Sequence, residues 1–528
     1  MHPVLLIPEI LHHIASFNDP ATNAIAAQTC RFWSEICLPF AWEVVDDENR
    51  LLCLCRPFMS ENRDSISPTI LLHGWDRFRR YASWARELHF NADSKEPLEI
   101  IQLSIFKPAN CFPRLRTLRW IGEDDDESLD CCVAFMQDSL ERFELRLGPY
   151  CSWDKANLVL SMLPVKVPGL QVLVLEVDPW WNEIEMTNDV VKTWEALIAS
   201  LPCLREISVP SFPLMERVVA ALSLRPAFEK MSFVPQLDTV VLRFKPVLEG
   251  GFSSLQHLML GPVDFILVLP FLSDPLLRPV LLRSLHLTSP DAEDNEIIYD
   301  LFTTISSKFP HLEELSILCA SFHAEDENDE PLDTVKFKHI TPLLACRSMK
   351  KFCFRHPAAL LISNAEYLQL ATSWPLIQTL ILNHTPYYLY YSNIPIYTDA
   401  FKRGLSTLLS TCRCLEVLGL YMDTDNVPVT FVLPEVDRKS SLRKLYVGNS
   451  VVEDSGCLMV AKNLSNLLPL NCEVLPRDSS SDHDNFNVYL EPQVAEWVDE
   501  YDEKWSEVAK ALSKVRKEKR ESDCSISE

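Results

Sequence analysis

One pattern recurs along most of this chain: an apolar residue, two others, a second apolar residue, one other, and a third apolar residue. Clear copies begin about 30 residues apart, at Leu115, Leu140, Leu170, Leu204, Leu237, Leu255, Leu282, Leu312, Met349, Ile377, Leu415 and Leu442. A degenerate copy at Ala85 begins the series. Each copy predicts a short half-buried strand, and the residues that follow leave room for a helix. We expect these units to stack into a solenoid, because each can bury its apolar residues only against its neighbours.

Two further features support this interpretation. Proline stands two residues before the first apolar position in six copies, at Pro113, Pro168, Pro202, Pro235, Pro310 and Pro375. Proline ends the preceding helix and biases the residue before it towards extended geometry. Between copies, apolar residues recur at helical spacing, as at Val190, Trp194 and Leu197. The step of 18 residues from Leu237 to Leu255 leaves little room for a helix, which puts one of these two copies in doubt.

The fold class predicted from this pattern is α/β, with parallel strands in a curved sheet. The residue between the second and third apolar positions of each copy points away from the helices, so these residues form one column on the concave face. The column reads Arg119, Glu144, Val174, Ser208, Val241, Met259, His286, Ser316, Cys353, Ile381, Gly419 and Tyr446. Its middle is nearly uncharged.

The first 45 residues are organised differently. Pro8 stands where a helix begins, because its missing N–H would be unpaired there anyway. Glu9 in the first turn complements the helix dipole. Ile7, then Ile10 or Leu11, and then Ile14 recur at helical spacing and give one apolar stripe. A segment this small is marginal without a partner, so its surplus of apolar surface must be covered by another part of the chain or by another protein.

A second helix is expected from Asp19-Pro20 through Phe32 and Trp33, followed by an apolar cluster that ends at Trp42. The order Ile-Pro-x-x-Leu-x-x-Ile, then Cys-Arg-Phe-Trp from Cys30, then Trp42, resembles the F-box family. That family opens with Leu-Pro, and here Ile7 replaces the Leu.

The resemblance implies that residues 1–45 bind a small Skp-type adaptor, which bridges to a cullin scaffold and its RING subunit. The implied adaptor contacts are Ile7, Pro8, Glu9, Leu11, Ile14, Cys30, Phe32, Trp33 and Trp42. The repeats, over roughly residues 85 to 475, resemble the divergent leucine-rich repeats that follow F-boxes, closest to large sets of fungal F-box proteins, although the usual Asn or Cys is missing from most units. The function implied is that of a substrate-recognition subunit of an SCF-type cullin–RING ubiquitin ligase. One alternative is that the first helices only cap the repeats; another is a ubiquitin-independent interaction scaffold.

Two segments are candidate contacts for a protein substrate. Acidic runs follow several strands, and if they share one edge of the sheet they form an acidic rim that would attract a basic segment of a partner. The residues proposed for it are Glu325, Asp326, Glu327 and Asp329. Ordinary solvated loops are the other interpretation. The aromatic cluster Tyr387, Tyr388, Tyr390 and Tyr391 is the second candidate, because aromatic residues are good interface anchors, unless it packs down as an irregular strand.

Composition excludes several other classes. The chain has only 11 glycines in 528 residues and no glycine-rich phosphate loop, so a nucleotide-dependent enzyme is not expected. A net charge of −25 repels nucleic acid and anionic membranes. The 17 cysteines, such as Cys203, Cys319 and Cys412, show no C-x-x-C pair and are interpreted as reduced core thiols of a cytosolic or nuclear protein. No stretch is apolar enough to span a membrane, and no catalytic motif, cofactor or metal is expected.

The predicted organisation has five parts. They are an F-box domain at 1–45, a helical linker at 46–84, the repeats at 85–475, a flexible linker at 476–490 and an amphipathic helix at 491–520. The last of these carries apolar residues at alternating four- and three-residue steps, including Val494, Trp505 and Leu512. We expect it to fold back as a cap on the last repeat, with a coiled coil or a partner helix as the alternative.

Overall fold

The structure is a computed structural model. The residues that it describes are 3–46, 50, 72–91, 110–122, 126–178, 188–210, 216–234, 244–319, 333–386, 400–424, 440–452, 456–476 and 492–526. The chain divides into two compact units, which we call the N-terminal unit, Met1–Leu237, and the C-terminal unit, Asp238–Glu528.

The N-terminal unit opens with a small group of helices. They are a 3-10 helix at Pro3–Leu6, α1 (Pro8–Phe17), α2 (Pro20–Ala26) and α3 (Arg31–Ala41). Helix α1 begins at Pro8 as predicted, and the Asp19 carboxylate caps α2 by accepting from the Thr22 N–H at 2.9 Å. The prediction of one helix through Trp33 is wrong, because α2 ends at Ala26 and Cys30 adopts an extended conformation. This break lets α3 fold back onto α1 and bury its inner face.

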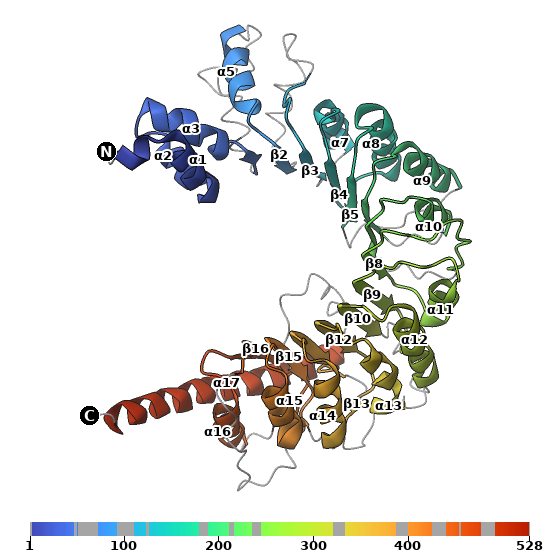
Figure 1. The fold of residues 1–528 in the computed structure, drawn as a ribbon, viewed down its shortest axis with the longest axis vertical. Helices are drawn as coiled ribbons and strands as arrows, with labels where there is room; N and C mark the ends of the chain where they lie inside the picture. The colour runs from blue at the N-terminus through green and yellow to red at the C-terminus, as the bar shows by residue number, and fades with distance from the viewer. Residues whose placement is uncertain are drawn as a thin grey trace. The chain divides into compact units, whose positions relative to one another are not determined.

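Parallel strands follow in the N-terminal unit. In chain order they are β1 (Val44–Val45), β2 (Glu87–Asn91), β3 (Thr117–Gly122), β4 (Arg142–Leu147), β5 (Val172–Val177), β6 (Glu206–Pro210) and β7 (Lys230–Val234). Each pairs in parallel with the next. The helices are α5 (Leu72–Ala82), α7 (Asp126–Cys132), a 3-10 helix at Val133–Phe135, α8 (Trp153–Lys166), α9 (Asn188–Ser200) and α10 (Glu216–Ser223). Helices α7 to α10 cover one face of the strands (Figure 1).

The C-terminal unit repeats the same plan. Its main strands are β8 (His257–Leu260), β9 (Ser284–Ser289), β10 (Glu314–Cys319), β12 (Lys351–Arg355), β14 (Thr379–Leu382), β15 (Val417–Leu420), β16 (Lys444–Tyr446) and β17 (Glu473–Leu475), again all parallel. A separate parallel pair joins β11 (Val335–Lys336) to β13 (Leu360–Leu361). The helices are α11 (Phe265–Ser273), α12 (Asn295–Lys308), α13 (Phe337–Ile340), a 3-10 helix at Thr341–Ala345, α14 (Asn364–Ser373), a π-helical turn at Ala400–Gly404, α15 (Leu405–Thr411), α16 (Cys457–Leu467) and α17 (Pro492–Ile526).

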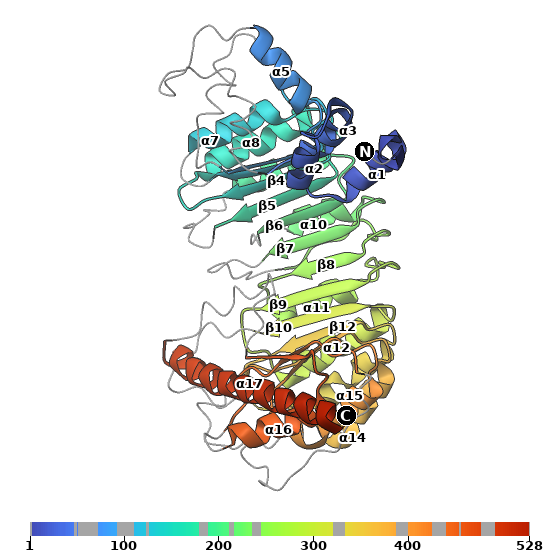
Figure 2. The same cartoon turned by 90° about the vertical axis from the view of Figure 1, so that its left-hand side faces the viewer.

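The fold is therefore mixed α/β and solenoid-like, as the repeat predicts. Within a strand, burial alternates: Leu118 and Trp120 are fully buried against the helices, while Arg119 between them is half-buried on the other face. Within each unit the strands lie side by side, and the face that carries residues such as Arg119 is the face not covered by helices (Figure 2). Among the described residues, no helix is both long enough and apolar enough to cross a membrane.

The predicted column is confirmed wherever its members are described. Arg119, Glu144, Val174 and Ser208 are paired in register in the N-terminal unit, and the series from Met259 to Tyr446 is paired in the C-terminal unit. Val241 lies outside the described residues. The neighbour of Ser208 is Ser232 of β7, a strand that the repeat starts omitted. Its segment Phe228-x-x-Met231-x-Phe233 fits the pattern with Pro226 two residues before it, whereas the predicted copy at Leu237 lies outside the described residues.

The sheet also begins earlier than predicted. Strand β1, at Val44–Val45, pairs with β2, so the series starts before Ala85. A strand of two residues is too short to show the full pattern, although Trp42-x-x-Val45 matches its first half. The end of the first helical segment therefore runs directly into the sheet.

A second column lies at the start of the strands, one residue after the first apolar position; we call it the strand-start column. Its members are Glu43, Arg86, Arg116, Glu141, Gln171, Arg205 and Glu229 in the N-terminal unit and Gln256, Arg283, Glu313, Lys350, Gln378, Glu416 and Arg443 in the C-terminal unit. Most of their carbonyl groups accept two N–H groups of the next repeat; the Arg116 oxygen accepts from Glu141 at 2.8 Å and Arg142 at 2.9 Å. Where charges alternate, side chains pair, as Glu43 does with Arg86 at 3.0 Å. This column was not predicted, although every position in it is charged or glutamine.

Helix α17 packs against the end of the C-terminal unit. Trp505 is buried, and its indole N–H donates to the Ser450 carbonyl at 2.8 Å. The Arg516 guanidinium donates to the carbonyls of Cys472 and Pro469, each at 2.8 Å. The helix lies beside α16 in both views (Figures 1 and 2). The prediction that this helix folds back as a cap agrees with these contacts. The flexible linker before it lies almost entirely outside the described residues. The structure describes little of the predicted helical linker at 46–84 other than helix α5.

The cysteines of the described residues are free thiols. Burial raises the pKa of Cys346 and of Cys412 to about 11, and that of Cys472 to about 12. Cys319 is buried as expected, whereas Cys203 is exposed. The interpretation as core thiols thus holds for the buried positions but not for Cys203.

Candidate docking surfaces

Helix α1 is apolar on two sides, and only one of them is covered. Its outward side presents Ile7, Ile10, Ile14 and Phe17, which we call the outer stripe; the exposed fractions are 42%, 36%, 38% and 77%. The spacing of three, four and three residues places them along one face of a helix. A helix in a globular protein normally buries its apolar stripe, so an exposed stripe of this kind indicates a surface for a partner.

The inward side of α1 builds the small core of the first helices. Leu11 and Ala15 are buried there with Cys37, and Phe32 and Trp33 pack against them. The resemblance implied Leu11 as an adaptor contact; in this structure Leu11 is only 1% exposed and belongs to the inner core. The physical reason is that Leu11 follows Ile10 by one residue and is therefore turned about 100° from Ile10 around the helix, towards the inner core.

The remaining implied adaptor contacts fall into two groups. Pro8, Glu9 and Cys30 are exposed near the outer stripe or at the start of α3. Trp42 instead packs on Tyr81 of α5, with ring centroids 5.3 Å apart, and the Arg50 guanidinium lies over its ring. The structure thus adds Ile10 and Phe17 to the surface, and their helical spacing with Ile7 and Ile14 was the sequence signal for them.

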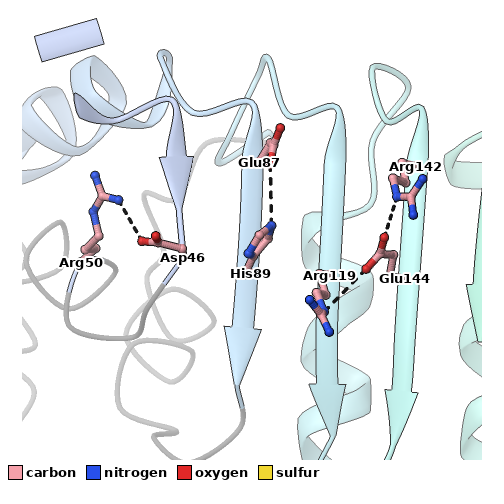
Figure 3. A network of polar contacts seen from close by, with 7 residues as sticks. All are labelled: Asp46, Arg50, Glu87, His89, Arg119, Arg142 and Glu144. Atoms are coloured by element: carbon pink, nitrogen blue, oxygen red, sulfur yellow. Dashed lines mark hydrogen bonds and ion pairs between the residues drawn. The ribbon is translucent and has the colours of Figure 1, made fainter. Parts of the chain in front are cut away.

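The open strand face of the N-terminal unit carries charges that pair with one another. The Glu144 carboxylate lies between two arginines, with Oε1 2.5 Å from Arg142 Nε and Oε2 3.6 Å from Arg119 Nε (Figure 3). On β2, His89 Nε2 lies 3.7 Å from the carboxylate of Glu87 (Figure 3). The charges of Arg119, Arg142 and Glu144 on this face are therefore paired with one another.

At the edge of the same face, Asp46 accepts from Arg50 Nη1 at 2.8 Å (Figure 3). Partial burial acts to raise the pKa of Asp46, but the hydrogen bond and the charge of Arg50 outweigh it and lower the pKa below its ordinary value. The carboxylate is thus held in its charged form by its own neighbour.

The strand face of the C-terminal unit is hollowed instead. A cavity of about 380 Å³ lies over β9 to β16. Its basic lining residues are Lys351, Arg355, Arg443 and Lys444, and its one acidic lining residue is Glu416. Cys353, Ile381 and Tyr446, from the predicted column, also line it. A cavity of this size lies within the range of small-ligand and peptide side-chain sites.

Polar groups of the C-terminal unit are buried where strands end. The His356 Nδ1 accepts from the Ala358 N–H at 3.0 Å and its Nε2 donates to the Glu293 carbonyl at 3.0 Å. Burial lowers the pKa of His356 to about 4, so the ring is neutral. Asn383, at φ 46°, accepts from the His356 N–H at 2.9 Å and donates to the Ala358 carbonyl at 2.6 Å.

Glu293 belongs to the acidic run at 291–296, which follows strand β9 and is one of the runs that the acidic-rim hypothesis places at the edge of the sheet. Its side chain is instead buried, and its Oε1 accepts from the Ser289 hydroxyl at 2.7 Å and from the Phe265 N–H. Burial raises its pKa. Asp291 and Asp294 on either side of it do remain exposed. Glu293 is therefore part of the internal loop structure and not of an acidic rim.

The residues predicted to contact a substrate lie outside the described residues. This applies to Glu325, Asp326, Glu327 and Asp329 and to Tyr387, Tyr388, Tyr390 and Tyr391. Both hypotheses remain predictions.

Comparison with known proteins adds little. The chain matches no family model and no curated protein. Among solved structures, it is similar to a crystal structure of a protein from Bacteroides fragilis at 15% sequence identity, over 56% of this chain and 73% of that one, with a TM-score of 0.29. A likeness this remote carries no argument about function.

Proposed function

We propose that this chain is an F-box protein with leucine-rich repeats, the substrate-recognition subunit of a cullin–RING ubiquitin ligase. In this role, the first helices bind a Skp-type adaptor and the repeats hold a protein substrate. The chain contributes no catalytic group, and acts by keeping a substrate lysine at high effective concentration near the ligase-bound ubiquitin.

The observation that supports this proposal most is the outer stripe of α1. Burying one isoleucine contributes about 1.5–3 kcal/mol. Two of them account for roughly 3–6 kcal/mol, which is enough to change a dissociation constant by a hundredfold or more. A cap on the repeats would bury such a stripe against the chain itself, whereas Ile7, Ile10, Ile14 and Phe17 all face solvent.

The arrangement of the first helices also fits the proposal. The inner core of Leu11, Ala15 and Cys37 holds α1 against α3 without using the outer stripe. The segment then runs directly into strand β1, so a protein bound to it would be tied to the repeats by a short connection. Whether a substrate has a basic segment for an acidic rim stays a prediction.

The test is binding between the full chain and a purified Skp-type adaptor, measured by calorimetry. The variant is Ile10→Glu/Ile14→Glu, which adds charge to the outer stripe without touching Leu11. The matched control is Ile266→Glu, on the exposed side of α11, where the isoleucine is 58% exposed. We expect the chain and the control to bind alike and the variant to bind at least about a hundredfold more weakly.

Two results would contradict the proposal. If the intact chain does not bind the adaptor, a ubiquitin-independent repeat scaffold becomes the better account. If the double variant binds as tightly as the intact chain while its circular dichroism is unchanged, the outer stripe is not the docking surface.

A further inference from the structure

The cavity of the C-terminal unit combines a cationic margin with an apolar floor. Lys351 and Lys444 occupy the first positions of β12 and β16. Arg443, a member of the strand-start column, immediately precedes Lys444. Two residues further along these strands, on the same face, lie Cys353 and the buried Tyr446. The cations therefore line one side of the cavity and the thiol and the phenol ring line its base.

These three cations have no ion-pair partner among the described residues. Among the described residues, no ion pair within 4.0 Å joins Lys351, Arg443 or Lys444 to a carboxylate. Glu314 of β10 and Glu473 of β17 are the strand neighbours of Lys351 and Lys444, but neither forms an ion pair within 4.0 Å with its neighbouring lysine and neither lines the cavity. Glu416 is its one acidic lining residue, against four basic ones. In a chain with a net charge of −25, this is a local reversal of sign.

A glycine makes room in the base of the cavity. Gly419 sits in the column between Ile381 and Tyr446. A Cβ at Gly419 would lie 2.7 Å from the Cδ1 atom of Ile381, so the glycine lets the Ile381 side chain lie flat over β15. Ile381 is buried as a result, and the space above it belongs to the cavity.

The dimensions favour an extended chain over a small anion. Lining residues run from His286 on β9 to Tyr446 on β16, across five strand-to-strand steps. At about 4.8 Å per step this is roughly 24 Å, the length of about seven extended residues. A free phosphate would occupy only one end of such a groove.

We propose that this cavity binds an extended protein segment through an acidic side chain, a carboxylate or a phosphorylated hydroxyl, held by Lys351, Arg443 and Lys444. That the segment belongs to a ligase substrate rests on the proposed function; the binding itself does not. Ionic screening lets an acidic segment approach this acidic chain, because at about 0.15 M ionic strength the Debye length is about 8 Å. Remote acidic surfaces are then largely screened, while side chains in direct contact are not.

The experiment measures binding of the full chain, without adaptor, to pools of fluorescent nine-residue peptides. The flanking positions of each pool are mixed, and the central residue is glutamate, phosphoserine, glutamine or lysine. The variant is Lys351→Gln/Lys444→Gln. The matched control is Lys230→Gln. Lys230 is the first residue of strand β7 in the N-terminal unit, as Lys351 and Lys444 are of their strands, and it is also half-buried.

We expect at least tenfold tighter binding of the glutamate or phosphoserine pool than of the glutamine pool. The double variant should lose that preference, and the control should keep it. A preference for glutamate alone identifies a carboxylate as the ligand, and one for phosphoserine identifies a phosphate; either supports the proposal. Equal binding of the glutamate, phosphoserine and glutamine pools, an unchanged double variant, or no binding of any pool would overturn it.

Inorganic phosphate in excess is added as a competitor in a separate arm. If phosphate alone binds as tightly as the best pool and with the same dependence on Lys351 and Lys444, the cavity is a small-anion site and the peptide proposal is wrong. Because no adaptor is present, a failure here leaves the adaptor test unaffected, and the reverse also holds.

Discussion

The two units share one strand–helix plan but place their polar interactions differently. In the N-terminal unit, ion pairs lie on the open strand face, as between Arg119 and Glu144, whose side chains are 41% and 18% exposed. In the C-terminal unit, polar side chains are buried where strands end, as for Glu293, His356 and Asn383, which are at most 7% exposed. Most ion pairs of the described residues belong to the first unit, and most buried polar side chains to the second.

This difference bears on both stability and binding. Exposed ion pairs contribute about 0–1 kcal/mol each, whereas leaving a buried donor or acceptor without its partner costs about 1–3 kcal/mol. A ligand that met the N-terminal face would have to break Arg119 and Arg142 from Glu144 first. In the C-terminal unit, Lys351, Arg443 and Lys444 form no ion pair among the described residues, so a ligand there would break none of their ion pairs.

The largest effect that we predict is for Asn383→Ala. This change removes the acceptor of the His356 N–H and the donor to the Ala358 carbonyl, and it puts alanine at a φ of 46°. We expect a loss of about 3 kcal/mol in the C-terminal unit, because two buried partners are lost and the backbone is strained. Hydrogen exchange of β12 and β14 measures it, with exchange of β3 and β4 unchanged.

Asn383→Gly is the control for that prediction. Glycine adopts a positive φ without strain but also lacks the side-chain amide, so it separates the two causes. We expect glycine to restore only part of the loss. If both variants lost less than about 1 kcal/mol, the buried loop contacts would not be the main support of this unit.

His356 makes the stability of the C-terminal unit dependent on pH. Its folded pKa of about 4 lies below the ordinary value of 6.5, so the unfolded chain takes up the proton first as the pH falls. The contribution is complete above pH 6.5 and is lost as the pH falls towards 4. Between pH 7 and pH 5 this amounts to about 2 kcal/mol. Denaturant unfolding at both pH values measures it.

The control for the pH dependence is His356→Gln, which cannot titrate. In this variant the difference between pH 7 and pH 5 should shrink by about the amount assigned to His356. An equal pH dependence in the variant would mean that other groups cause it.

Glu293→Gln should have a smaller effect, of opposite direction. Burial raises the pKa of Glu293, so the group favours folding when protonated, below its unfolded pKa, and this contribution is lost as the pH rises through the folded pKa. Glutamine keeps the acceptor oxygen for Phe265 and Ser289 and removes the buried charge. We expect a gain of up to roughly 1 kcal/mol near pH 7 that disappears at acidic pH. Glu293→Leu, measured beside it, should destabilise instead.

The sequence predicted the repeating parts of the molecule better than the particular ones. The strands could be placed because Leu118 and Trp120 alternate with Arg119, and that alternation directly reflects which side is buried. Strand β1 was missed because two residues carry too little pattern, and the break before Arg31 because helical spacing continues on both sides of it. Each error lies where tertiary packing, and not local periodicity, decides the structure.

The candidate surfaces were predictable only in part for the same kind of reason. Helical spacing placed Ile7 and Ile14 on one face, but it could not say that Leu11 belongs to the inner face until α3 was seen to fold back over it. The burial of Glu293 depends on a hydroxyl four residues before it and on an N–H 28 residues away. The cavity depends on Lys351 and Lys444, which lie 93 positions and three strand-to-strand steps apart and form no ion pair among the described residues, and no single repeat reveals this.

The smallest effects give the sharpest form of the comparison between the two strand faces. Arg119→Gln removes a cation that is paired with Glu144, and we expect a loss of up to about 1 kcal/mol in the N-terminal unit. Lys444→Gln removes a cation close to other cations, so the C-terminal unit should be unchanged or gain a few tenths of a kcal/mol. Denaturant unfolding of both variants at low and high salt measures this, and the two differences should shrink together as salt screens them. If Lys444→Gln were as destabilising as Arg119→Gln, Lys444 would have a partner within the chain, and the cations of the cavity would not be available to an acidic segment.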